Sequence, residues 1–322
     1  MRRLVAHWTR LTLRDAPCAR SSHRLSAVNG DAYLFGGEAT ARHAIDATLH
    51  RLDAAAGTWH SIKPAHAPPP RVGHAQAAVG GRLYVFGGRA GVEMGEAEMG
   101  DLWEYDAAAE AWQNVDVPSA PSARSFHAST AANGTFFVFG GCGADGRMSD
   151  LHRFCTTSRR WEELPPPPGV AGRGGAALEA SADGKELWLA GGFCGHETND
   201  LLRFCLQRGT WERLPSDWLR PRSVCASLAL RHGLLLFGGE VSPSDRGHEG
   251  AGGFASDLVA IDSRDGAPLD VRVAPGDTPA ARGWGSATSL SDSSGLLFGG
   301  LAGSDAAPER LDDAWLLRLE ED

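Results

Sequence analysis

The sequence predicts an all-β protein built from six repeats of about fifty residues each. Three observations support this prediction. A short apolar run ends in a glycine pair six times, an arginine precedes each pair at a nearly constant distance, and a tryptophan follows each of the first four pairs. Repeated units of this kind cannot bury their apolar faces alone, so residues 1–322 are expected to form one domain. The pairs are Gly36-Gly37, Gly87-Gly88, Gly140-Gly141, Gly191-Gly192, Gly238-Gly239 and Gly299-Gly300.

The strands of one repeat can be placed in order. A small-residue apolar strand follows the arginine, a second strand such as GRLYVFGG ends at the glycine pair, a third such as DLWEYD follows a variable loop, and the tryptophan opens a fourth. These short runs are rich in aromatic and aliphatic residues and are bounded by turn formers, which is typical of β-strands. Proline-rich links such as PAHAPPPR separate the repeats, because proline cannot continue a ladder. Each repeat is therefore predicted to form a four-stranded antiparallel sheet.

The two chain ends predict how the array closes. The sixth repeat stops after a third strand, LDDAWLLRLEED, whereas Trp8 precedes Arg20 by twelve residues, the distance that most internal tryptophans keep to the next arginine. Residues 1–16 are therefore expected to complete the last sheet and remove an exposed edge. The repeats would span about 17–63, 64–117, 118–165, 166–215, 216–273 and 274–322. The fifth has PLDVRV in place of its tryptophan, which should weaken packing there without changing the count.

One arginine per repeat and three histidines are expected to be structural. A residue present in every unit is predicted to build the unit, here by bonding backbone carbonyls between neighbouring sheets. The alternatives are an anion funnel around a pore for the arginines and metal ligation for the histidines, which have no carboxylate at a fixed spacing. The residues are Arg20, Arg71, Arg124, Arg173, Arg222 and Arg282, with His23, His74 and His127.

Composition argues against several functions. The net charge of -9 and the absence of any block of lysine or arginine argue against a general nucleic-acid binder. The sequence has no apolar run near the 18 or so residues that cross a bilayer, and its basic N-terminus lacks the apolar stretch of a secretory signal. The six cysteines form no C-x-x-C pair and are expected to be reduced. We expect a soluble cytoplasmic protein.

The repeat resembles that of the kelch family. The double glycine, the downstream tryptophan and the aromatic or apolar third strand all occur in register along the whole chain. The resemblance implies a six-bladed kelch β-propeller, in which each repeat supplies one blade around a central channel and the N-terminal strand completes the last blade.

The loop after the fifth glycine pair differs from the others. The loops that join the second and third strands should all emerge on one face, and this one, from Gly239 to Leu258, is the longest. It places Glu240, Asp245 and His248 within nine residues, among glycines that would let the three converge. Two carboxylates and an imidazole suit a divalent metal with open positions. The alternative is a solvated loop held by internal hydrogen bonds.

Four segments carry a narrower resemblance. GGRAG, FGGCGADGRMSDL, GGEVSPSDRGHEGAGGF and ARGW resemble the plant nitrile-specifier, epithiospecifier and thiocyanate-forming proteins and their kelch relatives. Those proteins bind Fe(II) and direct the breakdown of glucosinolate aglucones, and their iron ligands follow a Glu-x3-Asp-x3-His pattern. Glu240 and His248 match the first and last positions, whereas Ser244 occupies the middle one and Asp245 comes one residue late.

The same resemblance implies a substrate site. Arg89 and Arg147 match the family's sulfate-binding arginines, and Trp284 matches an aromatic residue beside the substrate. A lysine that the family places after the first glycine pair is missing, and GGEATARH offers only Arg42 or His43. The alternative for the two arginines is a solvated loop charge or an ion pair across loops, and for Trp284 a pore-lining aromatic.

Two functions follow as hypotheses. The first is a specifier-type, non-haem Fe(II)-dependent lyase or rearrangement protein acting on a small anionic, sulfated, thiohydroximate-like substrate. The metal would coordinate the substrate's thiolate while the arginines hold the departing sulfate. The second is a non-catalytic kelch scaffold that holds a protein partner on the loop face. A copper-radical oxidase is nearly excluded, because the tyrosines, Tyr33, Tyr84 and Tyr105, lie in or beside regular strands.

Overall fold

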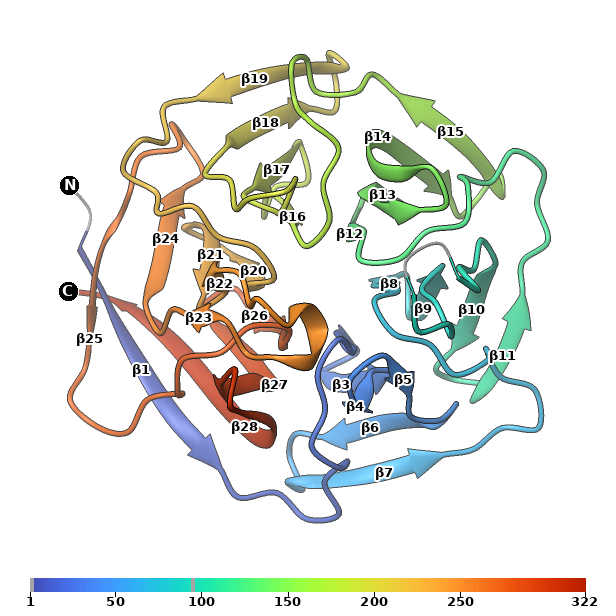
Figure 1. Cartoon of the computed structure of the whole chain (residues 1–322), viewed down its shortest axis with the longest axis horizontal. Helices are drawn as coiled ribbons and strands as arrows, with labels where there is room; N and C mark the ends of the chain where they lie inside the picture. The colour runs from blue at the N-terminus through green and yellow to red at the C-terminus, as the bar shows by residue number, and fades with distance from the viewer. Residues whose placement is uncertain (1–2, 94–95) are drawn as a thin grey trace.

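The computed structural model describes residues 3–93 and 96–322, the side chain of His248 excepted, and shows a six-bladed β-propeller (Figure 1). The predicted all-β propeller is confirmed. From the axis outward, blade one contains β2 (Arg24–Val28), β3 (Asp31–Phe35), β6 (Leu49–Asp53) and β7 (Thr58–Ile62). Blade two contains β8 (Ala75–Val79), β9 (Arg82–Phe86), β10 (Leu102–Asp106) and β11 (Ala111–Asn114). Blade three contains β12 (Ala128–Ala132), β13 (Thr135–Gly143), β14 (Gly146–Cys155) and β15 (Arg160–Leu164).

The remaining blades differ in strand number. Blade four contains β16 (Ala177–Ala180), β17 (Glu186–Ala190), β18 (Leu201–Cys205) and β19 (Thr210–Leu214). Blade five contains β20 (Ala226–Leu230), β21 (Gly233–Phe237) and β24 (Leu258–Asp262). Blade six contains β26 (Ser286–Ser291), β27 (Ser294–Ser304), β28 (Ala307–Glu321), β1 (Arg3–Leu11) and β25 (Asp270–Val273). In the described part of the chain, no helix has the length and apolar character needed to cross a membrane.

The N-terminal strand completes the last blade, as predicted. β1 pairs antiparallel with β28 from Leu4 to Leu11, so the first and last strands of the chain lie side by side (Figure 1). Leu4 is fully buried, and the Trp8 ring packs edge-on against Phe237 of blade five at 5.1 Å between ring centroids. The ring is therefore closed both by main-chain pairing and by a side-chain contact.

Tryptophans join the blades by a repeated contact. Each packs against the phenylalanine that precedes the glycine pair of the blade before it, with ring centroids 5.1 to 6.4 Å apart, a spacing typical of aromatic pairs. The pairs are Trp8–Phe237, Trp59–Phe298, Trp112–Phe35, Trp161–Phe86 and Trp211–Phe139. Where blade five lacks the tryptophan, blade four also lacks the phenylalanine and has Ala190 instead.

The outer strand of blade five departs from the expected arrangement. The Leu269 N–H still bonds the Ala260 carbonyl of blade five at 2.9 Å. From Asp270 onward, however, the chain pairs in parallel with β1, so the PLDVRV segment adds a fifth strand to blade six. The expected weaker packing stays a prediction, and the number of blades is unchanged although blade five has three strands. At this interface Trp188 of blade four packs with Leu234, Leu236 and Ile261 of blade five, but the tryptophan–phenylalanine pair of the other interfaces is missing.

The glycine pairs allow neighbouring blades to approach closely. The N–H of the second glycine donates to the carbonyl of the next blade's arginine at 2.8 to 3.0 Å, around all six interfaces. Gly36 has φ +65°, and a Cβ there would lie 2.6 Å from the Arg71 carbonyl oxygen. A side chain at this position would therefore separate the blades.

The repeated arginines are structural, as expected, but their side chains act within a blade. Each Nη1 donates to the carbonyl of the first glycine of its own pair at 2.8 to 3.1 Å. The expectation that the guanidinium groups bond carbonyls between sheets is therefore wrong, and the arginine carbonyl makes that link instead. Five of the six also pair with an aspartate, at Asp101, Asp150, Asp200, Asp257 and Asp313.

Asp101→Asn is predicted to destabilise the fold by about 3 kcal/mol, because it leaves the fully buried Arg71 guanidinium without its counter-charge. The carboxylate accepts bonds from Nη1 and Nη2 of Arg71 at 2.8 and 2.9 Å. Asp106→Asn is the matched control, since its ion pair with Arg82 is exposed and should contribute less than about 1 kcal/mol. Urea denaturation measures both losses, and equal losses would contradict the structural role given to Arg71.

The histidines are also structural. Nε2 of His23 and of His127 lie 3.2 and 3.1 Å from the carbonyl oxygens of Phe298 and Phe86 in the preceding blades. The His74 ring packs edge-on against Phe35. Burial lowers the pKa of His23 to about 3, so its ring is neutral in ordinary buffers.

Candidate active site at the loop face

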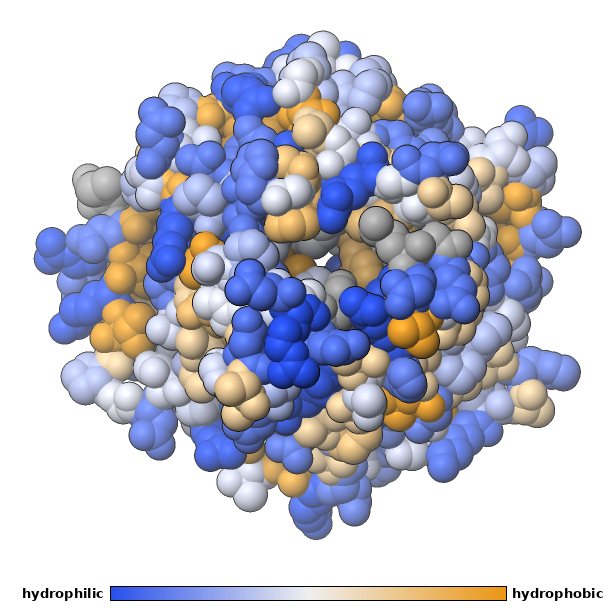
Figure 2. Space-filling model, in the orientation of Figure 1, coloured by the Kyte–Doolittle hydropathy of each residue, from blue (hydrophilic) through white to orange (hydrophobic). Residues whose placement is uncertain are grey.

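A cavity of about 300 Å³ lies where the loops after the glycine pairs converge. Its lining includes Arg42 of the first loop, Arg89 of the second, Arg147 of the third and Glu240 of the fifth. In Figure 1 the small strands β22 (Glu240–Ser242) and β23 (Gly253–Phe254) and the 3-10 helix η1 (Gly247–Glu249) lie near the centre of the ring. Figure 2 shows hydrophilic residues around a central hollow on this face.

The floor of the cavity is a closed ring of hydrogen bonds. The residue two positions after each repeated arginine has a positive φ of 49° to 63°, and its N–H donates to the carbonyl of its counterpart in the preceding blade at 2.6 to 3.1 Å. The bond from the Ser22 N–H to the Trp284 carbonyl closes the ring. The six residues are Ser22, Gly73, Phe126, Gly175, Val224 and Trp284.

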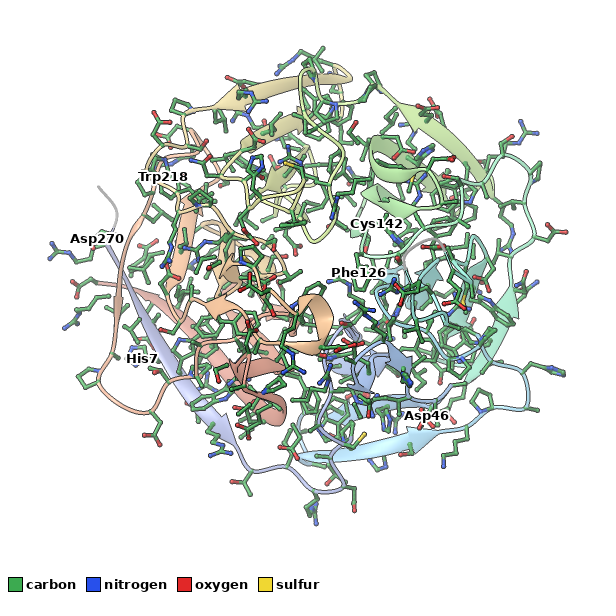
Figure 3. All side chains as sticks on the ribbon, viewed as in Figure 1. His7, Asp46, Phe126, Cys142, Trp218 and Asp270 are labelled. Atoms are coloured by element: carbon green, nitrogen blue, oxygen red, sulfur yellow. The ribbon has the colours of Figure 1, made fainter. Side chains whose placement is uncertain are left out.

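Two aromatic side chains of this ring meet across the axis. Phe126 comes from blade three and Trp284 from the opposite blade six, and their rings pack edge-on at 5.4 Å. Figure 3 places Phe126 and its neighbour Cys142 toward the centre of the molecule. Gly73 makes room for this contact, because a Cβ there would lie 2.7 Å from the Phe126 ring. The prediction that Trp284 stands beside the substrate site agrees with its place in the cavity floor, which a pore-lining aromatic would also occupy.

Arg89 is a buried cation without an ion pair. It is 3% exposed, and within the described residues no carboxylate lies within ion-pair distance of it and its Nε has no hydrogen-bond partner. Main-chain bonds with Val72 hold the residue, and its guanidinium lies 5.1 Å from the centroid of the Phe126 ring. Burial lowers the pKa of Arg89. Because burying an unpaired charge is costly, this arrangement favours an anionic ligand.

Two further arginines line the same cavity. Arg147 extends from β14 with its guanidinium 4.8 Å from the centroid of the Phe193 ring and its side chain exposed. Arg42 has φ +66° and contacts Glu93 from Nη1 at 3.4 Å, while its buried Nε has no partner among the described residues. Arg42 lines the cavity, whereas the exposed His43 does not.

Glu240 brings a carboxylate to the cavity. It is 9% exposed, and its Oε1 accepts the Ser244 N–H at 3.3 Å. Burial raises the pKa of Glu240 to about 7, and the nearby Glu197 carboxylate adds to the rise. Two acidic groups close together in a buried place favour either a proton or a cation between them. Gly252 keeps the loop close, because any Cβ there would collide with Oε1 of Glu240.

The predicted metal ligands are only partly brought together. Asp245 is exposed and does not line the cavity, and the His248 side chain lies outside the described residues. Ser244, at the family's aspartate position, donates instead from Oγ to Oδ1 of Asp305 in the sixth loop at 2.5 Å. Among the described side chains, no group of three His, Cys, Asp or Glu could hold a metal. The set of Glu240, Asp245 and His248 stays a prediction.

Sequence reasoning missed Phe126, Phe193 and Asp305. Phe126 could have been found, because it stands two residues after a repeated arginine, the same position as Trp284. Phe193 directly follows a glycine pair, as Arg89 does in its own blade, and only the folded loops place it beneath Arg147. No pattern in the sequence links Asp305 to Ser244, since the two residues are 61 positions apart.

Residues 22–239 match the family described as the KLHDC2/KLHL20/DRC7 Kelch-repeats domain. The chain belongs to this kelch-repeat family. Its likeness to a solved structure of YjhT, with a TM-score of 0.73 over 94% of this chain and 95% of that one, supports the fold. The two sequences are 19% identical, so that likeness concerns the fold alone.

The relatives differ in how much of this chain their alignments cover. The N-(sulfonatooxy)prop-2-enimidothioate sulfolyase of Thlaspi arvense is 28% identical over 358 residues, covering 99% of this kelch chain and 98% of that protein. Adagio-like protein 1 of Oryza sativa subsp. japonica is 31% identical over 182 residues, 53% of this chain and 28% of that protein. Human Kelch domain-containing protein 3 is 29% identical over 159 residues, 47% of this chain and 42% of that protein. The sulfolyase alignment covers almost the whole of both chains, whereas the other two cover about half of this chain.

Proposed function

We propose that this kelch propeller is a specifier-type lyase that acts on a small sulfated, thiohydroximate-like anion in the loop-face cavity. The observation that carries the proposal is the buried, unpaired Arg89 in one cavity with Arg42 and Arg147. Three guanidinium groups suit a sulfate, whose oxygens accept pairs of N–H bonds. The sulfolyase of Thlaspi arvense, similar over almost its whole length, supports the substrate class.

The charge change of the reaction matches the site. In an N-(sulfonatooxy)imidothioate, the N–O bond breaks and sulfate leaves with the bonding electron pair. The sulfate group carries one negative charge before this step and two after it. A bond at the imidate carbon shifts toward nitrogen as the N–O bond breaks, so the charge of the thiolate ends on sulfate and the organic product is neutral. Guanidinium groups that contact the sulfate oxygens therefore stabilise the transition state more than the ground state.

The aromatic residues orient the arginines and shape the cavity. Arg89 packs on the Phe126 face and Arg147 on the Phe193 face, so each guanidinium is held in one plane with its N–H edge available. Phe126 and Trp284 form an apolar floor that excludes water from beneath the substrate. The substrate's organic group would contact this floor while its sulfate faces the arginines.

Fe(II) is part of the proposal through Glu240. Its buried carboxylate has a raised pKa beside other acidic groups, which suits a cation ligand. Asp245 and His248 of the same loop are the other predicted ligands. Asp305 offers a further carboxylate, because the hydrogen bond that it accepts from the Ser244 hydroxyl brings it to this loop. A bound metal would supply Lewis acidity toward the substrate's sulfur.

Metal binding is expected to depend on Glu240 and more on Asp305 than on Asp245. Glu240→Gln removes the buried carboxylate and should weaken Fe(II) binding at least tenfold. Asp305→Asn should weaken it more than Asp245→Asn, because the Asp245 side chain is exposed. Anaerobic calorimetry with Fe(II) and metal analysis after gel filtration measure this without any activity assay. If Glu240→Gln binds Fe(II) as tightly as the wild type, the proposed metal site is wrong. If Asp245→Asn loses more Fe(II) affinity than Asp305→Asn, Asp245 is the ligand, as the sequence predicted.

The decisive test is sulfate release from N-(sulfonatooxy)prop-2-enimidothioate. The protein should accelerate release, or change the distribution of organic products, relative to buffer alone. The alternative is a scaffold that holds a protein partner on the loop face, where Val92 is 39% exposed at the cavity edge. The scaffold function would be assigned if the protein neither binds sulfate nor changes the reaction. It would also have to bind a protein partner that a variant at Arg147 no longer binds.

A further inference from the structure

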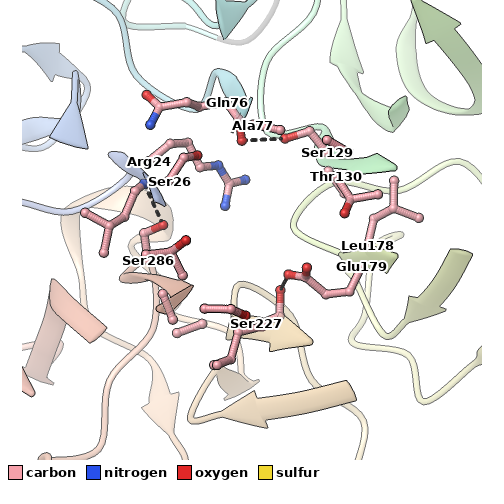
Figure 4. A pocket seen from close by; sticks show the side chains of 18 of the residues that line it. Arg24, Ser26, Gln76, Ala77, Ser129, Thr130, Leu178, Glu179, Ser227 and Ser286 are labelled. Atoms are coloured by element: carbon pink, nitrogen blue, oxygen red, sulfur yellow. Dashed lines mark hydrogen bonds between the residues drawn. The ribbon is translucent and has the colours of Figure 1, made fainter. Parts of the chain in front are cut away.

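A second cavity, of about 290 Å³, occupies the central channel on the other side of the hydrogen-bonded ring (Figure 4). The six innermost strands surround it, one from each blade. Between it and the loop-face cavity, around Phe126 and Trp284, lies a space of only about 30 Å³. We call this second cavity the channel chamber.

The channel chamber has a polar wall with two opposite charges. Most of the residues that line it are alanine, serine or threonine, so its space is not filled by large side chains. The charged residues among them are Arg24 of blade one and Glu179 of blade four, which is diametrically opposite. Figure 4 shows both side chains reaching into the same space from different sides.

Each charged group is hydrogen-bonded to blades other than its own. Arg24 donates from Nε to the His74 carbonyl at 3.1 Å and from Nη2 to the His127 carbonyl at 3.4 Å. Glu179 accepts the Ser227 hydroxyl on Oε1 at 2.7 Å. Within residues 3–93 and 96–322, no direct ion pair joins Arg24 to a carboxylate. Burial raises the pKa of Glu179 to about 7, while the Ser227 hydroxyl and the Arg24 charge act in the opposite direction.

We propose that the channel chamber binds a small zwitterion, with its carboxylate on Arg24 and its ammonium group on Glu179. Opposite charges held apart across a polar cavity match a ligand that carries both charges at its two ends. The volume is near the lower limit of ligand cavities, so the ligand is the size of a simple amino acid. This site is separate from the loop-face cavity and does not depend on the lyase proposal.

Calorimetry with glycine, acetate and methylammonium tests the proposal. Glycine carries both charges, whereas acetate and methylammonium carry one each. Glycine should bind more tightly than either fragment, and Arg24→Gln and Glu179→Gln should each weaken it at least tenfold. Glu179→Gln should also lower the ratio of glycine affinity to acetate affinity, because it removes only the carboxylate that binds the ammonium group. Arg153→Gln, an exposed change on β14, is the matched control and should leave glycine binding unchanged.

The outcomes are separable from a folding defect. Glu179→Gln keeps the size of the side chain, and its amide can still accept the Ser227 hydroxyl, so thermal unfolding should stay cooperative. If glycine does not bind, or binds equally well to both variants, the two residues form only a water-bridged ion pair and the proposal is wrong. Amide NMR shifts on the inner strands, rather than on the loops, would place the bound glycine in the channel chamber.

Discussion

Arg89→Gln is expected to weaken the binding of inorganic sulfate about 100-fold and to slow sulfate release by at least as much, while the fold becomes no less stable. Truncating one partner of a buried charge pair costs about 3 kcal/mol, which corresponds to a factor of about 100. Without ligand, however, Arg89 is a cation that is 3% exposed and has no ion pair among the described residues, so removing its charge relieves a desolvation cost. A gain or no change in stability together with lost binding separates a ligand-binding arginine from a structural one.

Sulfate calorimetry and thermal unfolding of the same samples measure the two effects. Arg89→Lys should recover little of the affinity, because lysine keeps the charge but loses the planar fork that packs on Phe126. Arg153→Gln is the control, since this exposed arginine pairs with Glu162 on the surface. A variant that loses stability but binds sulfate normally would show that Arg89 supports the loop, and the proposed substrate site would be wrong.

A chain that begins at residue 12 is expected to lose cooperative folding. The deletion removes β1, which pairs with β28 along eight residues and with β25 along four. It exposes one edge of β28 and the core around Leu4 and Ala6, both fully buried. The loss is comparable to the total stability of an ordinary domain, about 5 to 15 kcal/mol. Urea denaturation followed by tryptophan fluorescence should show a broad, non-cooperative transition.

Adding a peptide of residues 3–11 in trans should restore part of the cooperativity, because the vacated strand position between β28 and β25 is specific. Trp218→Ala is the control for loss of an aromatic residue elsewhere. That side chain is 37% exposed, and its removal should cost less than about 1 kcal/mol. If the shortened chain unfolds as sharply as the whole chain, β1 does not close the ring.

Repetition made the fold predictable. The glycine pairs, arginines and tryptophans recur because each interface between blades poses the same steric and hydrogen-bonding problem, and six copies of one solution form a recognisable pattern. The transfer of PLDVRV to blade six was not predictable in this way. It occurs where one blade has Ala190 in place of phenylalanine and the next blade lacks the tryptophan, and only the folded interface brings these two positions together.

Residues that line the loop-face cavity could be selected from the sequence only where the loops match the pattern of the resembled proteins. Arg89, Arg147, Trp284 and Glu240 all line one cavity, and their roles in it stay predictions. Asp245 was predicted as a ligand from its distance along the chain, yet its side chain is exposed. Asp305 reaches Ser244 from another blade, a contact between residues too far apart in sequence for spacing to reveal.

By itself, the sequence determined the number of blades and the closing strand, because these depend on local patterns repeated in every unit. Tertiary structure alone decided which charges remain unpaired. Arg71 and Arg89 are both buried, but Arg71 pairs with Asp101 whereas Arg89 packs on a ring and has no carboxylate within ion-pair distance among the described residues. The same holds for Arg24 and Glu179, which face one another only because the ring of blades brings its first and fourth members to opposite sides of one channel.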